Sequence, residues 1–313
     1  MIGNEKCEPH IAVLMSTYNG AEYLREQIES ILQQKDVHIE LYIRDDGSTD
    51  GTKSILEEYN SYENVHVNFA VNKGVIASFM ELLYTVPKEY EYYAFSDQDD
   101  YWLEEKLKVA VDKIKARHIP QLYFSRKKYV NDKLQPLPLK DYDVRGTSIG
   151  FALMNSCASG CTMVFNKLLY NELCLSHPEP KCMSMHDAWV YIVAAAVGEV
   201  IYDSNSYILY RQHGDNVSFL GTEMRNSTWE HWKLRFKTVL GRRNDLRRSY
   251  YAQQVLAGYG NKLNDREYDI IYDLANVRKS YVSRYRLCFS NKLHTQKRWE
   301  IIFIKMFIML GWI

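Results

Sequence analysis

The chain has 313 residues, of which 46% are hydrophobic and 25% are charged. This composition is typical of a folded globular protein and excludes an intrinsically disordered chain. The net charge of zero hides a split, because residues 225–313 hold 18 Lys and Arg against 7 Asp and Glu, and residues 1–224 hold 21 against 32. A basic C-terminal part predicts contact with an anionic partner, either a membrane surface or a nucleic acid.

The cysteines indicate the compartment. The sequence contains no CxxC pair and no N-terminal apolar segment with a cleavage site, so we expect a reducing, cytoplasmic environment. Cys157 and Cys161 lie close enough in sequence to share a metal ion. Without a second pair nearby, structural packing is the favoured interpretation of these two residues.

The first 130 residues alternate between two periodicities. Apolar runs predict strands, and helical periodicity between them places residues such as Leu24, Ile28 and Ile31 on one face. The predicted strands are residues 10–16, 40–46, 66–71, 92–97 and 121–125. Strands that alternate with helices predict an α/β fold with a doubly wound, mostly parallel sheet.

Polar or glycine-containing turns follow four of these strands. STYNG follows the first strand, RDDGSTDG the second, NKG the third and SDQDD the fourth. Ligands of such sheets bind in the crevice beyond the carboxyl ends of the strands, so the four turns predict one shared site. The sequence contains neither GxGxxG nor GxxxxGK[ST], which disfavours dinucleotide cofactors and phosphate-loop ATPases.

The alternation weakens after residue 130 and then returns. Residues 161–166 and 199–213 predict two more strands, and residues 186–198 predict a helix. After residue 221 the sequence predicts only helices, including residues 231–243 and the basic run 277–298. We therefore expect an α/β domain at residues 1–221 and a helical, basic region at residues 222–313.

The last segment, WEIIFIKMFIMLGWI from Trp299 to Ile313, is strongly apolar. It is shorter than the roughly 20 residues that a membrane-spanning helix needs. Its basic flank and terminal tryptophans predict a helix that lies in a lipid headgroup layer. A helix packed on the body of the protein, or on a partner chain, is the alternative.

The stretch SDQDD places three carboxylates within four positions. Alternation at a strand end directs Asp97 and Asp99 the same way and Gln98 elsewhere. Two carboxylates at a crevice suit Mg²⁺ or Mn²⁺, whose remaining ligands are water and a substrate diphosphate. A calcium loop of the EF-hand type is excluded because its required glycine and glutamate are absent. Asp100 is expected to cap a helix that starts near Leu103.

The turn after the second strand offers two further acids. Asp45 or Asp46 is expected to accept hydrogen bonds from a nucleobase or a ribose in the same crevice. A turn that only leads into a helix is the alternative interpretation of this segment.

Five segments in this order, VLMSTYNG, IRDDGSTDGT, FSDQDDYW, MHDAW and YRQHGDNV, resemble the family 2 glycosyltransferases of GT-A fold. The likeness is greatest to bacterial rhamnosyltransferases that build cell-wall and capsular polysaccharides. It covers roughly residues 10 to 220, and the combination of FSDQDDYW with YRQHGDNV is specific.

This resemblance implies a role for individual residues. Asp97 and Asp99 match the DxD pair that holds a divalent metal on the donor diphosphate, and His213 matches a histidine near that metal. Asp187 matches the catalytic base of inverting enzymes. Asp46 with Asp45, and Thr17 with Tyr18, match nucleotide-binding positions. A carboxylate at a helix start is favoured in its ionised form by the helix N-terminus, which suits a general base.

The resemblance also implies substrates and a location. We expect transfer of L-rhamnose from its dTDP form to a lipid-linked glycan, by a peripheral protein on the cytoplasmic face of the cell membrane. A UDP-hexose donor is one alternative, and a non-catalytic membrane or nucleic-acid-binding protein is another; nucleic acid is not the expected partner. The sequence departs from the family in CASGCTMVFN and after NKG, where Ala77 and Ser78 replace a common Lys-Asn pair. Trp102 and Trp189 are expected to be packing residues.

Overall fold

The predicted parallel strands form one half of the sheet. In this computed structural model, β1 (His10–Thr17) pairs in parallel with β2 (His38–Asp45) and β4 (Tyr92–Ser96), and β2 pairs in parallel with β3 (Val65–Phe69). The carboxyl ends of these strands therefore lie at one edge, as the sequence predicts. The structure describes residues 8–114, 118–139, 141, 143–155, 157–214, 247–296 and 300–313.

The other half of the sheet is mixed. Among the described residues, eight strands form one sheet in the order β3-β2-β1-β4-β7-β6-β8-β5. β7 runs antiparallel to β4 and β6, β8 runs parallel to β6, and β5 runs antiparallel to β8. The sequence did not indicate β5, because two residues are too few to show alternation. These strands are β5 (Tyr101–Trp102), β6 (Gln121–Val130), β7 (Val164–Asn166) and β8 (Glu199–Arg211).

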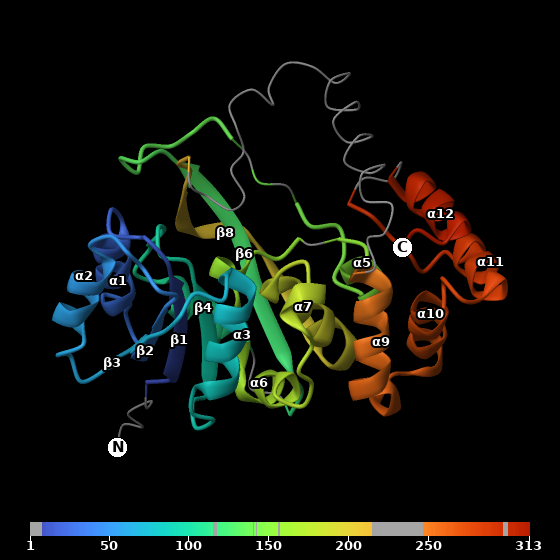
Figure 1. Ribbon diagram of the computed structural model, residues 1–313, viewed down its shortest axis with the longest axis horizontal. Helices are drawn as coiled ribbons and strands as arrows, with labels where there is room; N and C mark the ends of the chain where they lie inside the picture. Colours follow the sequence, from blue (N-terminus) through green and yellow to red (C-terminus); the bar gives the residue numbers. More distant parts are fainter. Residues whose placement is uncertain are drawn as a thin grey trace, which may run out of the picture.

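Helices cover both faces of the sheet, so β1 is buried on both sides (Figure 1). Its residues Ala12 and Leu14 belong to a core with α3, α6 and α7, whereas Ile11, Val13 and Met15 belong to a second core with α1, α2 and α4. A strand buried on both faces needs an apolar residue at almost every position, which explains the run IAVLM. The helices are α1 (Leu24–Leu32), α2 (Thr52–Tyr59), α3 (Val75–Thr85), α4 (Lys106–Lys113), α6 (Lys167–Leu173) and α7 (His186–Val197).

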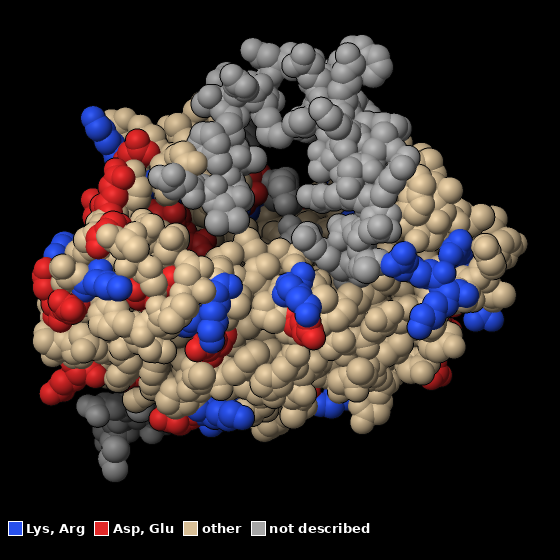
Figure 2. Space-filling model, in the orientation of Figure 1, with Lys and Arg blue, Asp and Glu red and all other residues tan. Residues whose placement is uncertain are grey.

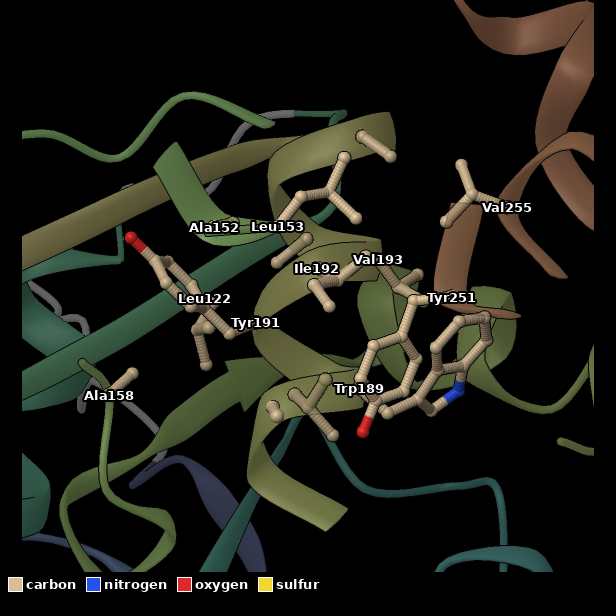
Figure 3. Close-up of a cluster of buried hydrophobic side chains, with 14 of the residues drawn as sticks. Leu122, Ala152, Leu153, Ala158, Trp189, Tyr191, Ile192, Val193, Tyr251 and Val255 are labelled. Carbon is tan, nitrogen blue, oxygen red and sulfur yellow. The ribbon is translucent and has the colours of Figure 1, made fainter. Parts of the chain in front are cut away.

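The first core continues into the C-terminal helices. Figure 3 shows Trp189 and Tyr251 side by side, and their ring centroids lie 6.1 Å apart. Ile192 and Val193 of α7 and Val255 of α9 (Arg247–Tyr259) are also buried here. Helix α7 therefore lies between the sheet and α9. The expected domain boundary at residues 221 and 222 falls outside the described residues.

Among the described residues, α9 is followed by three more α-helices, namely α10 (Asp265–Ala275), α11 (Tyr281–Phe289) and α12 (Glu300–Leu310). The predicted helical run 277–298 is only partly helical, because α11 ends where Ser290 adopts an extended conformation. The helix predicted at 231–243 lies outside the described residues. Within the described part of the chain, no helix is long and apolar enough to cross a membrane.

Short helical segments complete the path of the chain. Helix α5 contacts α7 at the edge of the first core, and η1 leads into β7 beside β4. Within the described ranges these segments are α5 (Ile149–Ala152), η1 (Gly160–Thr162), η2 (Pro180–Cys182) and η4 (Gly260–Lys262).

Candidate active site

A cavity of about 450 Å³ lies at the carboxyl ends of the parallel strands. Five of the predicted site residues line it, namely Tyr18, Asp46, Asp97, Asp99 and Asp187. They come from four separate segments of the sequence, the ends of β1, β2 and β4 and the start of α7. The structure therefore brings most of the predicted residues to one place.

Asp46 connects two of the predicted turns. Its Oδ1 accepts a hydrogen bond from the backbone N–H of Lys73 at 2.8 Å, and its Oδ2 accepts one from that of Gly74 at 2.8 Å. Arg44 also donates to Oδ1. Gly74 has a φ of 83°, which glycine adopts without strain. Asp46 thus fixes the loop between β3 and α3 at the mouth of the cavity.

Asp45 points to a different place. Its side chain is fully buried and accepts hydrogen bonds from the N–H and the hydroxyl group of Ser48. It is not among the residues that line the cavity. Of the two acids that the sequence offers for nucleotide binding, Asp46 borders the cavity and Asp45 stabilises the turn after β2.

Gln98 joins the first and fourth turns. Its Oε1 accepts a hydrogen bond from the Thr17 hydroxyl at 2.6 Å and from the Tyr18 N–H at 2.8 Å. A Cβ on Gly20 would lie 2.3 Å from the same oxygen, so this glycine permits the close approach. Thr17 is buried and holds Gln98, whereas the Tyr18 side chain is exposed at the cavity. The alternation of SDQDD indicated a separate direction for Gln98 but not this bridging role.

The predicted metal ligands are divided between two neighbouring groups. Asp99 Oδ2 lies 2.8 Å from His213 Nε2, so these two residues form a pair. Asp97 instead belongs to a group with Asp100 and Cys161, whose possible ligand atoms all lie within 4.8 Å of one another. The pKa of Asp97 is raised to about 7, mainly by burial and to a smaller extent by the negative charges of Asp99 and Asp187.

Asp100 does not cap a helix, contrary to the prediction. Helix α4 starts at Lys106, and Glu105 precedes it without a side-chain cap. Asp100 is fully buried and its Oδ1 accepts a hydrogen bond from the backbone N–H of Arg211 at 3.2 Å. The strand β5 intervenes between Asp100 and α4, which is why the capping prediction was wrong. Burial raises the pKa of Asp100 well above its usual value.

A buried lysine, Lys106, and a half-buried one, Lys127, lie close to this acidic group, and no motif in the sequence indicated either. The Lys106 Nζ lies 3.3 Å from the centre of the Trp102 ring, a cation–π contact, and burial lowers its pKa to about 7. Lys127 of β6 donates a hydrogen bond to the Ser159 hydroxyl at 2.8 Å. Its charge opposes part of the rise that burial causes in the pKa values of Asp97 and Asp187. Lysine side chains thus offset part of the negative charge.

Asp187 lies in the first turn of α7. Its Oδ2 accepts a hydrogen bond from the backbone N–H of Gly160 at 3.0 Å, and its Oδ1 has no hydrogen-bond partner among the described residues. Burial raises the pKa of Asp187 to about 6. The helix N-terminus alone would lower the pKa of this carboxyl group, so burial is the larger effect. At neutral pH a carboxyl group with this pKa is still mostly ionised.

Comparison with known proteins identifies the family. Residues 12–172 match the profile described as "Glycosyl transferase family 2". The chain is 31% identical over 292 residues to "dTDP-rhamnosyl transferase RfbG" of Shigella flexneri, which covers 83% of this chain and 97% of that protein. The chain belongs to glycosyl transferase family 2. A second relative, the "Putative teichuronic acid biosynthesis glycosyltransferase TuaG" of Bacillus subtilis, is 35% identical over 32% of this chain and 40% of its own length.

Solved structures show the fold of this family 2 glycosyltransferase. S. aureus TarS 1–349 matches with a TM-score of 0.57 and 18% identity, over 97% of this chain and 80% of that one. The mannosyltransferase PcManGT from Pyrobaculum calidifontis, in complex with GDP-Man and Mn²⁺, matches with a TM-score of 0.52 and 14% identity, over 90% and 73% of the two chains. The predicted GT-A fold, a mixed and mostly parallel sheet flanked by helices, is therefore confirmed.

The acidic residues fit a divalent cation. Asp97 has its pKa raised by burial and by other carboxylates, and one buried oxygen of Asp100 has no hydrogen-bond partner within the described ranges. A cation beside Asp97 offsets the repulsion between these carboxylates, because it supplies positive charge and accepts oxygen ligands. Asp97 and Asp99 are the residues that would hold it at the cavity. Cys161 is fully buried beside these acids, whereas Cys157 does not belong to this group.

Trp102 and Trp189 are both buried, as predicted for packing residues. Trp102 supports Lys106 and belongs to the second core. Trp189 joins α7 to α9 and so holds the start of α7, with Asp187, at the cavity. Neither ring lines the cavity.

Proposed function

We propose that this family 2 glycosyltransferase transfers L-rhamnose from dTDP-L-rhamnose with inversion at the anomeric carbon. One observation carries the proposal: Asp97, Asp99 and Asp187 line a single cavity at the carboxyl ends of the strands. The identity to a protein named dTDP-rhamnosyl transferase, over 97% of its length, supports the choice of donor. Asp46, Tyr18 and the backbone after β1 border the nucleotide end of this cavity.

In this proposal Asp187 has one task and the pair Asp97 and Asp99 has another. Asp187 accepts the proton of the acceptor hydroxyl, whose oxygen bonds to the anomeric carbon while the bond from that carbon to the diphosphate oxygen breaks. Its Gly160 hydrogen bond keeps the carboxylate oriented. A bound Mg²⁺ or Mn²⁺ would neutralise the negative charge that develops on the leaving diphosphate. Asp97 and Asp99 would hold it, and His213 orients Asp99.

The C-terminal helices supply the second part of the proposal, a peripheral location on the cytoplasmic face of the cell membrane with a lipid-linked glycan as acceptor. Helix α12 packs Ile304 and Ile308 into the core but exposes Ile302 and Met306. Figure 2 shows Lys and Arg gathered at the end of the molecule where α10–α12 lie. Apolar side chains next to basic ones suit an anionic lipid surface. The division into a catalytic part, 1–221, and a membrane-associating part, 222–313, belongs to this proposal.

The donor is tested by release of nucleoside diphosphate from a panel of dTDP- and UDP-sugars, with Mg²⁺, Mn²⁺ or EDTA. We expect release from dTDP-L-rhamnose that requires the metal and is lost in Asp99→Ala. An Asp112→Asn variant, changed in an exposed acid of α4, is the control and should keep full activity. Release from a UDP-hexose instead would transfer the proposal to that donor class. Binding of no nucleotide sugar, measured by calorimetry, would contradict the proposed function.

A further inference from the structure

His186 is a buried histidine at the start of α7 with no assigned role. Its side chain is 3% exposed, and neither ring nitrogen has a hydrogen-bond partner among the described residues. An unpaired buried polar group costs about 1–3 kcal/mol, so two such nitrogens in one side chain need an explanation. A histidine that served only as packing could be replaced by an aromatic residue at no such cost.

Two phenylalanines fix the orientation of this ring. Phe79 stacks on His186 with the ring centroids 3.9 Å apart and an interplanar angle of 19°, and Phe95 meets it edge-on at 5.0 Å. Burial lowers the pKa of His186 to about 3, so the imidazole is neutral. A neutral imidazole has one donor and one acceptor nitrogen, which suits a hydroxyl group better than a charged ligand.

The Nε2 atom of His186 faces Gly160 across the wall of the cavity. A Cβ on Gly160 would lie 2.8 Å from Nε2, closer than real Cβ contacts, so a side chain at this position would block the nitrogen. Gly160, His186 and Asp187 all line the cavity. Because the Gly160 N–H donates to Asp187, the imidazole and the candidate base lie on the same wall.

The order of the strands places this wall at the sugar end of the cavity. Asp46 and Asn72 follow β2 and β3, Asp97 and Asp99 follow β4, and Gly160 precedes β7, the next strand across the sheet. We place the diphosphate of a nucleotide sugar at Asp97 and Asp99 and its nucleoside at Asp46. The sugar then lies beside Gly160 and His186. This placement rests on the proposed function.

We propose that Nε2 of His186 forms a hydrogen bond with a hydroxyl group of the donor sugar. Phe79 and Phe95 hold the ring, the glycine at position 160 keeps a side chain away from Nε2, and the bond satisfies a nitrogen that the described part of the protein leaves unpaired. His186 thereby distinguishes a nucleotide sugar from the bare nucleotide.

Calorimetry with dTDP-L-rhamnose and with dTDP, in the presence of Mn²⁺, tests this role. We expect the wild type to bind the sugar nucleotide more tightly than dTDP. The loss of one neutral hydrogen bond in His186→Phe should reduce this preference by roughly fivefold and leave the Kd of dTDP unchanged. His186→Gln, whose amide nitrogen can occupy a position similar to Nε2, should restore part of the preference.

A purely structural role gives different results. His186→Phe would then keep the wild-type preference for the sugar nucleotide over dTDP. Gly160→Ala provides a second variant if His186→Phe does not fold, and it should also reduce the preference. Gly258→Ala is its matched control, since a Cβ there would lie 3.5 Å from the Cβ of Ser176, an ordinary van der Waals contact.

The wild type separates failure of this inference from failure of the proposed function. Equal affinity of the wild type for dTDP-L-rhamnose and dTDP would overturn the role of His186 and leave the nucleotide site intact. If only UDP-sugars bind, the same comparison is made with UDP-GlcNAc and UDP. If no nucleotide sugar binds, the proposed function and the inference both fall.

Discussion

Asp187 is subject to two opposing effects on its carboxylate. The N-terminus of α7 favours the anion, and burial favours the neutral acid and raises its pKa to about 6. Because the base must be ionised, the turnover rate should be constant above about pH 7 and should fall tenfold per unit below pH 6. The measurement is a pH profile of dTDP release under saturating donor. A rate that stays flat from pH 7 to pH 5 would exclude this assignment.

Asp187→Asn keeps the shape of the side chain and an oxygen for the Gly160 N–H. It removes the base, and we expect turnover to fall by roughly 10²–10⁴-fold, the usual contribution of general base catalysis. Donor affinity, measured by calorimetry, should change little. Full activity of this variant would remove Asp187 from the mechanism.

Asp97 makes a separate prediction about metal binding. Burial and neighbouring carboxylates raise the pKa of Asp97 to about 7, from an ordinary value of 3.8. Without metal, the folded protein therefore loses stability relative to the unfolded chain as the pH rises from 3.8 towards 7. Asp97→Asn should therefore melt at a higher temperature than the wild type at pH 8, and the difference should shrink at pH 5. Differential scanning fluorimetry without metal checks this. A variant that melts below the wild type at pH 8 would contradict the expected sign.

Addition of Mn²⁺ should reverse that order. Metal bound only by the folded protein stabilises it by about 2.7 kcal/mol at a hundred times its Kd, so the melting temperature of the wild type should rise by several degrees. Asp97→Asn should lose most of this rise, and EDTA should abolish it in both. The exposed Asp112→Asn change is the control and should respond to Mn²⁺ like the wild type.

At the scale of elements, the segments with an apolar period were predictable and the two-residue strand β5 was not. The strands β1, β2, β3, β4 and β6 and the helix α7 each carry a clear apolar period, so the sequence indicated them. The short strand β5 carries none, and its omission caused the wrong capping role for Asp100. The antiparallel direction of β7 depends on pairing between distant segments, which periodicity does not encode.

The site was predictable where chemistry and strand ends coincide. Asp46, Asp97, Asp99 and Asp187 line the cavity as the motifs indicated. The side-chain pairings within it were not predictable, because they depend on distances between separate elements. Examples are the contact of the buried Lys106 amino group with the Trp102 ring and the hydrogen bond from the Thr17 hydroxyl to Gln98.

The contact between α7 and α9 holds the candidate base in place and predicts a stability effect. Val255 is fully buried in this contact, whereas Val282 of α11 is 60% exposed. Val255→Ala should lower the free energy of unfolding by about 2 kcal/mol, through lost burial and a residual cavity. The matched change Val282→Ala should cost less than about 0.5 kcal/mol. Denaturant unfolding measures both, and equal effects would mean that α9 contributes no packing energy.

At the scale of the whole molecule, charge and exposed apolar residues are unevenly distributed. Acidic side chains gather over α1 and α2, and basic ones at the end formed by α10–α12 (Figure 2). At that end, exposed apolar residues project from two packed helices, which we call the α11–α12 surface. It comprises Tyr281, Val282, Tyr285 and Phe289 of α11 and Ile302, Met306, Met309 and Leu310 of α12. Exposed apolar patches of this kind commonly mark an interaction site.

If the α11–α12 surface docks on a membrane, its apolar residues and the basic residues beside it both contribute. The full chain should co-sediment with phosphatidylcholine vesicles that contain phosphatidylglycerol, bind less to vesicles without it, and lose binding as salt screens the charges. Tyr285→Ser combined with Ile302→Ser should weaken binding strongly. The matched control changes Tyr62 and Val71, exposed side chains near the opposite, acidic end, to Ser and should bind like the wild type.

Nucleic acid and an anionic membrane would bind this end of the molecule through different residues. Nucleic acid binds mainly through phosphate contacts, so it would depend on Arg278 and Lys279 and show a steep salt dependence, with little effect of Ile302→Ser. An anionic membrane also buries the apolar side chains, and each removed apolar group should reduce the vesicle affinity even at constant charge. Equal vesicle binding by the wild type and the Tyr285→Ser, Ile302→Ser variant would therefore refute the membrane role of this surface, and retention of both proteins on RNA would point to the other partner.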